Sequence, residues 1–402
     1  MLIHEAHIVL GVTGGIAAYK AADLASKLVQ AGAAVDVIMT EAATHFVGPL
    51  TFQALTGRPV HTDMFRLLEQ TEMAHLSLAW RASVLVIAPA TANTIAKLAH
   101  GIADNLLCAT ALASSAPLVL APAMDAGMWE HPAQQENLET LRRRGAIVVG
   151  PGEGRLASGR VGRGRMAEVP EMLRTIRLVL GRAGPLAGRQ VVVTAGGTQE
   201  PIDPVRFVGN RSSGKMGYAL AQAALDRGAS VTLISAPTAL PAPIGAVRVE
   251  VQTAEEMRAA VLEAVPRCDI LAMAAAVADF RPAEAVAHKI KKGRAGLRLR
   301  LERTPDILAE VAAERERSGR PAFVIGFAAE TQDLLENARA KLRRKRLDLI
   351  VANDVSGPDS GFAVDTNRVT LLARDGSEEA LPLLSKDEVA GRIWDRIVKM
   401  RR

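Results

Sequence analysis

The stretch His7–Val12, with the sequence HIVLGV, is followed directly by Thr13-Gly14-Gly15 and then by the amphipathic stretch Ile16–Gln30. A nearly continuous run of branched apolar residues is typical of a parallel strand that is buried on both faces. Glycines between a strand and a helix let the backbone approach an anion, which the free N–H groups of the helix start can bind. The opening of the chain therefore predicts an α/β fold with a parallel sheet covered by helices.

The same order of apolar strand, glycine-containing turn and helix recurs along the chain. In the first half we predict a helix at Gln134–Arg144 and further strands at Ala34–Met39, Ser83–Ala88, Pro117–Ala121 and Ala146–Val149. After Gly181–Arg189 (GRAGPLAGR), which lacks apolar periodicity, we predict strands at Gln190–Thr194, Ser230–Ser235, Asp269–Ala274, Ala322–Gly326, Leu347–Ala352 and Arg368–Ala373 and a final helix at Lys386–Met400. This pattern predicts two tandem three-layer domains with mainly parallel sheets, residues 1–180 and 190–402, joined by a linker at 181–189.

The composition excludes several classes of protein. Of the 402 residues, 49% are hydrophobic and 23% are charged, which argues against extensive disorder. The two cysteines, Cys108 and Cys268, exclude a disulfide framework and a four-thiolate metal site, and the histidines show no metal-ligand spacing, so we predict no structural metal and a cytoplasmic protein. No apolar run reaches the roughly 20 residues of a membrane span. The net charge of +6 suits phosphorylated ligands, whereas the low aromatic content of 3% argues against nucleic acid.

Two turns in the first half are candidates for one phosphate site. Gly14 and Gly15 follow the first strand, but the dinucleotide fingerprint is not met, and Thr40 stands after the second strand where an acidic residue would hold a ribose. A mononucleotide phosphate therefore fits better than a dinucleotide, although a tight turn without a ligand is an equal alternative. Thr91 and Asn93 follow the strand SVLVIA and could cap a helix or bind the same phosphate.

The second half carries a glycine- and serine-rich loop and two basic runs. The loop Gly209–Met216 nearly matches a P-loop, but Met216 stands where a hydroxyl should bind Mg²⁺, so we predict only an anion-binding loop beside Gly196-Gly197-Thr198. The basic runs His288–Lys292 and Arg339–Arg346 could be solvated surfaces or could hold a triphosphate. In the first half, His75 could likewise be a structural hydrogen-bonding residue or a catalytic one.

These motifs together resemble one family. The first half contains IVLGVTGGIAAYK, MAHLSLA and APATANTIAKLAHGIADNLL, and the second half contains VTAGGTQEPIDPVRFVGNRSSGKMGYALA, AAAVADFRP, HKIKK, GFAAET and DLIVANDV. From about Ile8 to Val355 the chain resembles the bifunctional coenzyme A biosynthesis proteins, in which a phosphopantothenoylcysteine decarboxylase is fused to a phosphopantothenate–cysteine ligase. The combination of GNRSSGKMG with AAAVADF is highly specific for this family.

The resemblance implies a flavodoxin-like N-terminal domain that uses FMN. In such enzymes FMN oxidises the substrate thiol to a thioaldehyde, CO₂ then leaves from the position β to the thiocarbonyl, and the electrons return to give 4′-phosphopantetheine. By similarity, Gly14, Gly15, Thr40, Thr91 and Asn93 belong to the FMN site. His75 would be the active-site histidine, and the turn at Met124 and Asp125 would hold the substrate carboxylate.

The resemblance also implies a Rossmann-like C-terminal ligase that depends on CTP and Mg²⁺. CTP would activate 4′-phosphopantothenate as an acyl-cytidylate, which the cysteine amine then attacks. Lys289 would be needed to form the cytidylate and Asn210 to convert it. The residues that correspond to CTP contacts are Met273, Ala274, Ala275, Asp279, Lys289, Pro305, Asp306, Ile307, Leu308, Phe327, Lys341 and Lys345. By analogy with the family, a homo-oligomer is expected, with trimeric decarboxylase contacts and dimeric ligase contacts.

Two residues depart from the family pattern in the decarboxylase half. Asp125 replaces the usual asparagine of Pro-Ala-Met-Asn, and Ser158 replaces the cysteine that usually protonates the enethiolate. An ionised Asp125 would repel a substrate carboxylate, so we expect a raised pKa, a different orientation or a role in protonation. We hypothesise that protonated Asp125, or a water held by Ser158, is the proton donor. The alternatives are an oxidative decarboxylase that stops at the enethiol and an FMN-binding regulatory protein whose decarboxylase half is inactive.

Overall fold

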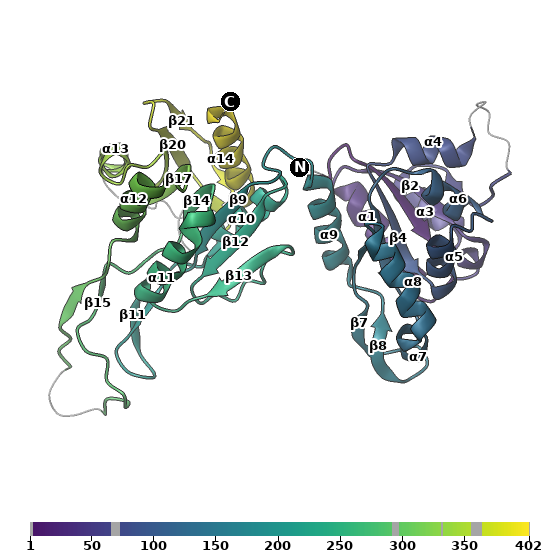
Figure 1. The fold of residues 1–402 in the computed structure, drawn as a ribbon, viewed down its shortest axis with the longest axis horizontal. Helices are drawn as coiled ribbons and strands as arrows, with labels where there is room; N and C mark the ends of the chain where they lie inside the picture. Colours follow the sequence, from purple (N-terminus) through teal and green to yellow (C-terminus); the bar gives the residue numbers. More distant parts are fainter. Residues whose placement is uncertain (1–2, 66–72, 292–296, 331–332, 355–363, 402) are drawn as a thin grey trace. The chain divides into compact units, whose positions relative to one another are not determined.

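The computed structural model describes residues 3–65, 73–291, 297–330, 333–354 and 364–401 (Figure 1). The chain folds as two compact units, Met1–Gly181 and Arg182–Arg402. Within the described residues, no helix has the length and apolar character that crossing a membrane requires.

The first unit is built on a six-stranded sheet in which all neighbouring strands are parallel. In spatial order the strands are β3 (Val60–His61), β2 (Ala34–Met39), β1 (His7–Val12), β4 (Val84–Ala90), β5 (Leu118–Pro122) and β6 (Ile147–Val148). Without the two-residue edge strand β3, this order is that of flavodoxin, as the family resemblance implies. The order reverses at β1, so a crevice is expected at the carboxyl ends of β1 and β4.

Helices cover both faces of this sheet (Figure 1). Alternate residues of β1 enter two different hydrophobic clusters: Ile8 and Leu10 pack on one face, and Val9 packs on the other. The first cluster includes residues of α1 and α9, and the second includes residues of α4, α5, α6 and α8. The helices are α1 (Ala18–Gln30), α2 (Glu41–Thr44), α3 (Pro49–Thr56), α4 (Ala74–Arg81), α5 (Ala92–His100), α6 (Leu106–Ala113), α7 (Ala126–Glu130), α8 (Pro132–Arg143) and α9 (Val169–Gly181).

The second unit is built on an eight-stranded sheet. Its spatial order is β13 (Ala246–Glu250), β12 (Ser230–Ser235), β9 (Gln190–Ala195), β14 (Ile270–Met273), β17 (Phe323–Glu330), β18 (Leu349–Asp354), β20 (Val369–Ala373) and β21 (Glu378–Ala380). The first six strands are parallel, and their order is the Rossmann order, which reverses at β9. The last two strands pair antiparallel at one edge of the sheet.

Helices again cover both faces of this sheet. On one face, residues of α11, α12 and α13 share a hydrophobic cluster with the strands. On the other face α10 packs against α14, where the buried Trp394 indole donates a hydrogen bond of 3.0 Å to the carbonyl of Leu220. The helices are α10 (Lys215–Leu225), α11 (Ala254–Ala264), the short 3₁₀-helix η1 (Val265–Arg267), α12 (Ile307–Ser318), α13 (Leu334–Arg344) and α14 (Lys386–Met400).

Among the described residues, four small antiparallel pairs lie outside the two large sheets, and the sequence analysis predicted none of them. They are β7 with β8 (Gly152–Arg155, Val161–Arg165), β10 with β11 (Gln199–Pro201, Phe207–Gly209), β15 with β16 (Phe280–Pro282, Leu301–Arg303) and β19 with β22 (Thr366–Asn367, Leu384–Ser385). Their strands are short and mostly polar, so they lack the apolar runs that marked the sheet strands. The predicted sheet strands are present, with ends that differ by a few residues: β17 continues to Glu330, four residues beyond the predicted Gly326. The edge strands β3, β13 and β21 were not predicted.

Candidate active sites

In the first unit, one buried threonine ties together the turns that follow β1 and β4. The hydroxyl of Thr13 donates a hydrogen bond of 2.7 Å to the carbonyl of Pro89 and accepts one of 3.1 Å from the amide of Thr91. The two predicted phosphate turns therefore lie next to each other at the carboxyl ends of adjacent parallel strands. The sequence analysis did not single out Thr13, although a polar residue directly after a buried strand was a usable signal.

Gly14 lies where no side chain can fit. A Cβ atom at Gly14 would lie 2.4 Å from the Cβ of Ala42 in α2, whereas one at Gly15 would meet only the Thr91 methyl group at 3.8 Å. Thr40 precedes α2, and its hydroxyl caps this helix by accepting a hydrogen bond of 3.3 Å from the amide of Ala43. The turn after β1 is thus held tightly against the start of α2.

Thr91 caps the helix that begins after β4. Its hydroxyl accepts a hydrogen bond of 3.4 Å from the amide of Thr94 and donates one of 3.2 Å to the Thr94 hydroxyl, while Asn93 is exposed in the first turn of α5. Thr91 therefore caps a helix, which is one of the two roles that the sequence analysis left open. The start of α5 remains suited to an anion because the helix dipole is positive there.

The β7–β8 hairpin lies beside α7, the short helix that follows the turn after β5 (Figure 1). The amide of Met124 donates a hydrogen bond of 3.0 Å to the carbonyl of Gly164. A Cβ atom at Gly164 would lie 2.2 Å from the carbonyl oxygen of Met124, and one at Gly162 would lie 3.0 Å from the Cβ of Ala126. Glycine at position 164 therefore permits the contact between the hairpin and the turn.

The two departures from the family pattern meet at this contact. The Ser158 hydroxyl, at the tip of the hairpin, donates a hydrogen bond of 2.6 Å to Oδ2 of Asp125, whose Oδ1 accepts one of 3.1 Å from the amide of Gly127. The hydrogen bond from Ser158, followed by that from Gly127, lowers the pKa of the Asp125 carboxyl, and the charge of Arg160 adds to this effect. The expected raised pKa of Asp125 is therefore wrong, because the carboxylate is the hydrogen-bond acceptor of this pair.

His75 lies in the first turn of α4 and is partly buried. No hydrogen bond among the described residues joins it to Asp125 or Ser158. The structure places these residues in one unit but shows no direct contact between His75 and the Asp125–Ser158 pair.

In the second unit, a cavity of about 630 Å³ lies at the carboxyl ends of β14 and β17. All the predicted CTP contacts except Lys289 line this cavity. Its wall includes Ser212–Gly217 from the predicted anion-binding loop and the N-terminus of α12. Six basic and two acidic side chains surround it, which favours an anionic ligand: Lys215, Arg303, Lys341, Arg344, Lys345 and Lys386 against Asp279 and Asp306.

Main-chain hydrogen bonds shape one wall of this cavity. The backbone after β14 runs beside the glycine turn after β9: the amide of Ala276 donates to the carbonyl of Gly196 at 2.9 Å, and the amide of Thr198 donates to the carbonyl of Ala276 at 3.2 Å. Elsewhere in the cavity lining, the Lys341 ammonium donates a hydrogen bond of 2.8 Å to the carbonyl of Phe327, and Lys345 pairs with Asp306. The lysines of the second basic run thus reach the cavity from α13 and the residue that follows it.

Several residues of the cavity wall were missed by the sequence analysis. Lys386 is buried, its ammonium donates a hydrogen bond of 2.5 Å to the carbonyl of Val364, and burial lowers its pKa, with the nearby Lys215 charge acting in the same direction. Asn353 and Asn367 each have a buried side-chain oxygen without a hydrogen-bond partner in the described part of the chain. Asn353 lies near the end of a predicted buried strand, and a polar residue there could have been recognised from the sequence. No sequence pattern marks Lys386 or Asn367 as a residue of the site.

The two predicted ligase catalytic residues do not line the cavity. Asn210 contacts a residue of the cavity wall: its Nδ2 donates a hydrogen bond of 2.6 Å to the carbonyl of Ala276, which lines the cavity. Lys289 is exposed in the segment between β15 and β16, and Lys292, the last residue of the first basic run, lies outside the described residues. Among the residues that the structure covers, no group of three or more His, Cys, Asp or Glu side chains could hold a metal ion.

Each unit places glycine turns and helix starts at the carboxyl ends of parallel strands, next to the strand where the order reverses. This is the architecture of enzymes that bind nucleotides or other phosphorylated ligands. Comparison with known proteins agrees: residues 2–181 match the Flavoprotein family model, and residues 186–400 match the DNA/pantothenate metabolism flavoprotein C-terminal domain.

Two relatives and one solved structure illustrate the similarity. The coenzyme A biosynthesis bifunctional protein CoaBC of Bacillus subtilis is 47% identical over 99% of this chain and 98% of its own length. The protein of the same name from Mycobacterium tuberculosis is 49% identical over 97% of this chain and 96% of its own length. A crystal structure of the C-terminal domain of a CoaBC protein is 41% identical over 54% of this chain and 97% of that chain, with a TM-score of 0.46.

The chain therefore belongs to the family of bifunctional coenzyme A biosynthesis proteins. It is an enzyme of coenzyme A biosynthesis with a decarboxylase and a ligase activity.

Proposed function

We propose that residues 190–402 use CTP to join cysteine to 4′-phosphopantothenate and that residues 1–180 use FMN to decarboxylate the 4′-phosphopantothenoylcysteine that results. The observation that carries the proposal is a basic cavity lined by all the predicted CTP contacts except Lys289. A triphosphate and a nucleoside fit its chemistry, because basic side chains and the start of α12 bind anions while Phe327 and Leu308 offer apolar contacts.

In the ligase half, the basic side chains neutralise the triphosphate while the 4′-phosphopantothenate carboxylate attacks the α-phosphorus of CTP. The products of this step are the acyl-cytidylate and pyrophosphate. The neutral amine of cysteine then attacks the acyl carbon, the amide forms, and CMP leaves. We assign Lys289 to the first step and Asn210 to the second. Mg²⁺, when bound, would neutralise phosphate charge, and Asp279, an exposed carboxylate in the cavity wall, would be the residue to hold it.

In the decarboxylase half, the residues present fit an FMN phosphate, since the Cβ position of Gly15 meets nothing nearer than the Thr91 methyl group at 3.8 Å and the start of α5 lies beside the same turn. We propose that Gly14, Gly15, Thr40, Thr91 and Asn93 hold it. When bound, FMN supplies the oxidation of the substrate thiol that makes loss of CO₂ possible, and it later returns the electrons. The turn at Met124 and Asp125 holds the substrate end that carries the carboxylate, with His75 as the active-site histidine.

Gly14→Ala is expected to weaken flavin binding. The added methyl group would lie 2.4 Å from the Cβ of Ala42, so the turn after β1 must move away from α2. The flavin absorbance per mole of purified protein measures the effect, and titration with FMN should give a Kd at least about tenfold higher, the change that a cost of about 1.4 kcal/mol produces.

Gly48→Ala is the matched control, because no atom lies within 4 Å of the Cβ position at Gly48. It should keep the full flavin content. A Gly14→Ala protein with the same flavin content as the Gly48→Ala protein would show that the Gly14 turn does not hold the cofactor.

Asp125→Asn is expected to leave the shape of the pH profile for CO₂ release unchanged. Because the pKa of Asp125 is lowered, its carboxylate loses its proton below the ordinary range, and it does not titrate between about pH 5 and pH 9. The change should lower KM for the substrate by about fivefold, the size of an interaction between like charges about 4 Å apart in water. If CO₂ release continues but the saturated thiol no longer forms, Asp125 is the proton donor after all.

The Ser158–Asp125 hydrogen bond favours a second candidate for the first unit, an oxidative decarboxylase that stops at the enethiol. The Ser158 hydroxyl donates its proton in a hydrogen bond to the Asp125 carboxylate. A hydroxyl held in this way is a poorer acid than the thiol that it replaces, whose ordinary pKa is about 8.5. The mass of the product separates the two, since the enethiol is two hydrogens lighter. The adjoining ligase half supports full conversion to 4′-phosphopantetheine.

We also propose a cytoplasmic homo-oligomer. Large apolar side chains such as Ile16, Tyr19 and Trp80 are exposed in the first unit, with Trp80 70% exposed, and burial of such residues between copies of the chain would stabilise an assembly.

One reaction tests the proposed function. Purified protein is incubated with CTP, Mg²⁺, cysteine and 4′-phosphopantothenate, and the products are identified by mass. Pyrophosphate, CMP, CO₂ and 4′-phosphopantetheine are expected. Protein that carries no flavin and releases no pyrophosphate would contradict both halves of the proposal.

A further inference from the structure

Lys386 is a buried lysine that lines the basic cavity of the second unit. It is the first residue of α14, only 6% of it is exposed, and its ammonium donates a hydrogen bond of 2.5 Å to the carbonyl of Val364. Burial, followed by the charge of Lys215, lowers the pKa of Lys386, while the charge of Asp365 acts in the opposite direction. The fold therefore places an ammonium group where burial disfavours its charge, and an anion bound beside it would offset that cost.

The short β19–β22 pair brings Lys386 next to a second lysine of the cavity wall. Lys386 directly follows β22, and Asp365 directly precedes β19, with which β22 pairs antiparallel. The amide of Lys386 donates a hydrogen bond of 2.9 Å to the carbonyl of Asp365. Oδ1 of Asp365 accepts one of 2.6 Å from the ammonium of Lys215, the first residue of α10. Two lysines that are far apart in the sequence therefore lie around one carboxylate.

Both lysines lie at the end of the cavity that the predicted anion-binding loop forms. Residues Ser212–Gly217, which include Lys215, line the cavity together with Lys386. The helices α10 and α14 pack against each other, and the first residue of each lines the cavity. The start of α10 adds the positive end of a helix dipole. A helix start and two ammonium groups thus meet here, and the Asp365 carboxylate offsets one of these charges.

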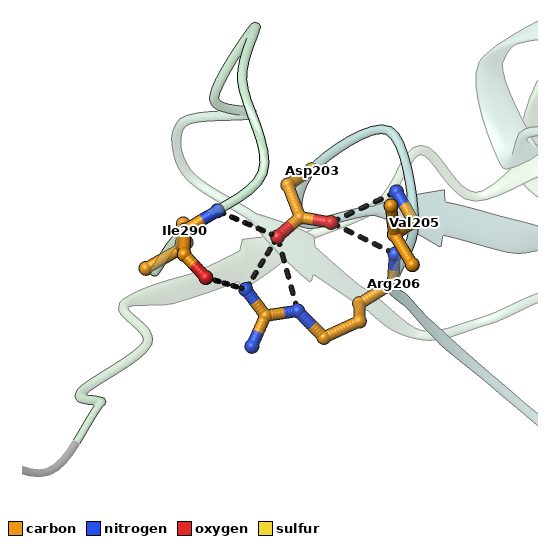
Figure 2. A network of polar contacts seen from close by, with 4 residues as sticks. All are labelled: Asp203, Val205, Arg206 and Ile290. Carbon is orange, nitrogen blue, oxygen red and sulfur yellow. Dashed lines mark hydrogen bonds and ion pairs between the residues drawn. The ribbon is translucent and has the colours of Figure 1, made fainter. Parts of the chain in front are cut away.

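A buried ion pair in the same unit illustrates a charge that the protein itself satisfies (Figure 2). The side chain of Asp203 is fully buried, and its Oδ1 accepts hydrogen bonds from the amides of Val205 and Arg206. Its Oδ2 accepts from the Arg206 guanidinium and from the amide of Ile290. The Arg206 guanidinium, followed by the amides, holds the pKa of Asp203 far below its usual range. Asp203 therefore needs no ligand, whereas Lys386 has its pKa shifted away from the charged form and lines a cavity.

We propose that Lys386 binds the β- and γ-phosphates of CTP and stabilises the pyrophosphate that leaves. This inference rests on the proposed function of the second unit. When the carboxylate oxygen of 4′-phosphopantothenate attacks the α-phosphorus, the bond from that phosphorus to the bridging oxygen breaks, and its electron pair leaves with pyrophosphate. The departing group gains one negative charge in this step. A cation beside it therefore stabilises the transition state more than the bound substrate.

Two observations favour the polyphosphate of CTP over the single phosphate of 4′-phosphopantothenate as the occupant of this end. The loop Gly209–Met216 lacks the hydroxyl of a P-loop but keeps its lysine position at Lys215, and in a P-loop that lysine reaches the β- and γ-phosphates. Two cations and a helix start also match a chain of phosphates, which carries several negative charges. The nucleoside contacts at Asp279 and Phe327 line the same cavity, so one nucleotide can occupy both parts.

Lys386→Met tests the assignment in the full chain, because methionine fills a buried space without a charge. In a single turnover with CTP and 4′-phosphopantothenate but no cysteine, pyrophosphate release should slow by about 10- to 100-fold, the range for loss of one hydrogen bond to a charged group. The Kd of inorganic pyrophosphate, measured by calorimetry, should rise by a similar factor. The Kd values of CMP and of 4′-phosphopantothenate should stay the same, because neither ligand carries the β- and γ-phosphates.

Lys399→Met is the matched control. Lys399 is exposed in the last turn of the same helix and does not line the cavity, so its replacement should leave pyrophosphate release and all three Kd values unchanged. The thermal unfolding midpoint and CO₂ release by the other unit are measured on both variants. If Lys386→Met lowers the unfolding midpoint, Lys386→Gln, which keeps a donor for the Val364 carbonyl, replaces it in every measurement.

Three results are decisive. Equal pyrophosphate affinity of the Lys386→Met and Lys399→Met proteins would overturn the assignment. A raised Kd for 4′-phosphopantothenate with an unchanged Kd for pyrophosphate would also overturn it, since the phosphate of that substrate would then be the group bound by Lys386. If the unmodified protein releases no pyrophosphate from CTP, the proposed function itself fails, and this result is distinct because it involves no variant.

Discussion

Gly164→Ala is expected to reduce CO₂ release by at least about 100-fold while leaving ligation intact. The added Cβ atom would lie 2.2 Å from the carbonyl oxygen of Met124, and a backbone oxygen cannot rotate out of the way as a side chain could. The hairpin must therefore separate from the turn at Asp125, and Ser158 moves with it. A displacement of about 1 Å at an active site can cost about 100-fold in rate.

Gly152→Ala in the same hairpin is the matched control. Its Cβ atom would meet only the carbonyl oxygen of Arg165 at 3.9 Å, which is an ordinary contact. CO₂ release should be close to that of the unmodified enzyme. Equal CO₂ release by the Gly164→Ala and Gly152→Ala proteins would show that close contact between the hairpin and the turn is not required for decarboxylation.

Lys289→Gln is expected to reduce pyrophosphate release from CTP and 4′-phosphopantothenate by about 100- to 1,000-fold, the range found when one group that stabilises transition-state charge is removed. The substitution keeps a polar side chain, one atom shorter than lysine, and removes its charge. CO₂ release from supplied 4′-phosphopantothenoylcysteine should not change, because that reaction belongs to the other unit.

Asn210→Asp provides the complementary measurement for the second ligase step. Its side chain has nearly the same shape, but it cannot donate to the carbonyl of Ala276, and its charge would oppose an oxyanion. Pyrophosphate release should continue, while amide formation with cysteine falls. A Lys289→Gln protein that forms the acyl-cytidylate as fast as the unmodified enzyme would contradict the assignment of the two steps.

Much of the fold could be predicted because its main signals are local. The strands Ala34–Met39 and Ser230–Ser235 and the helix Lys386–Met400 have the predicted bounds. Each is a run with a clear apolar pattern, and a parallel sheet requires such runs because both of its faces are covered. The helix after β1 starts at Ala18, two residues after the predicted Ile16, because the glycine turn extends to Ala17.

The candidate sites could be predicted only in part. Residues of the basic cavity such as Asp279, Phe327 and Lys341 were predicted from the family resemblance. The spacing of these residues alone did not predict them. Lys386 and Asn367 were not found, since nothing in their local sequence distinguishes them from ordinary helix and strand residues. Their presence in the cavity wall depends on how α14 and β19 pack near the start of α10.

Local sequence alone determined where the buried strands and the glycine turns of this protein lie, because apolar periodicity and backbone freedom are properties of neighbouring residues. Only the tertiary structure decided that Ser158 and Asp125, 33 positions apart, share a hydrogen bond and that the carboxyl therefore has a lowered pKa. It also decided that Asp203 holds the backbone next to Lys289. Such hydrogen bonds depend on the directions and distances of groups that the fold brings together, and no periodicity in the chain encodes them.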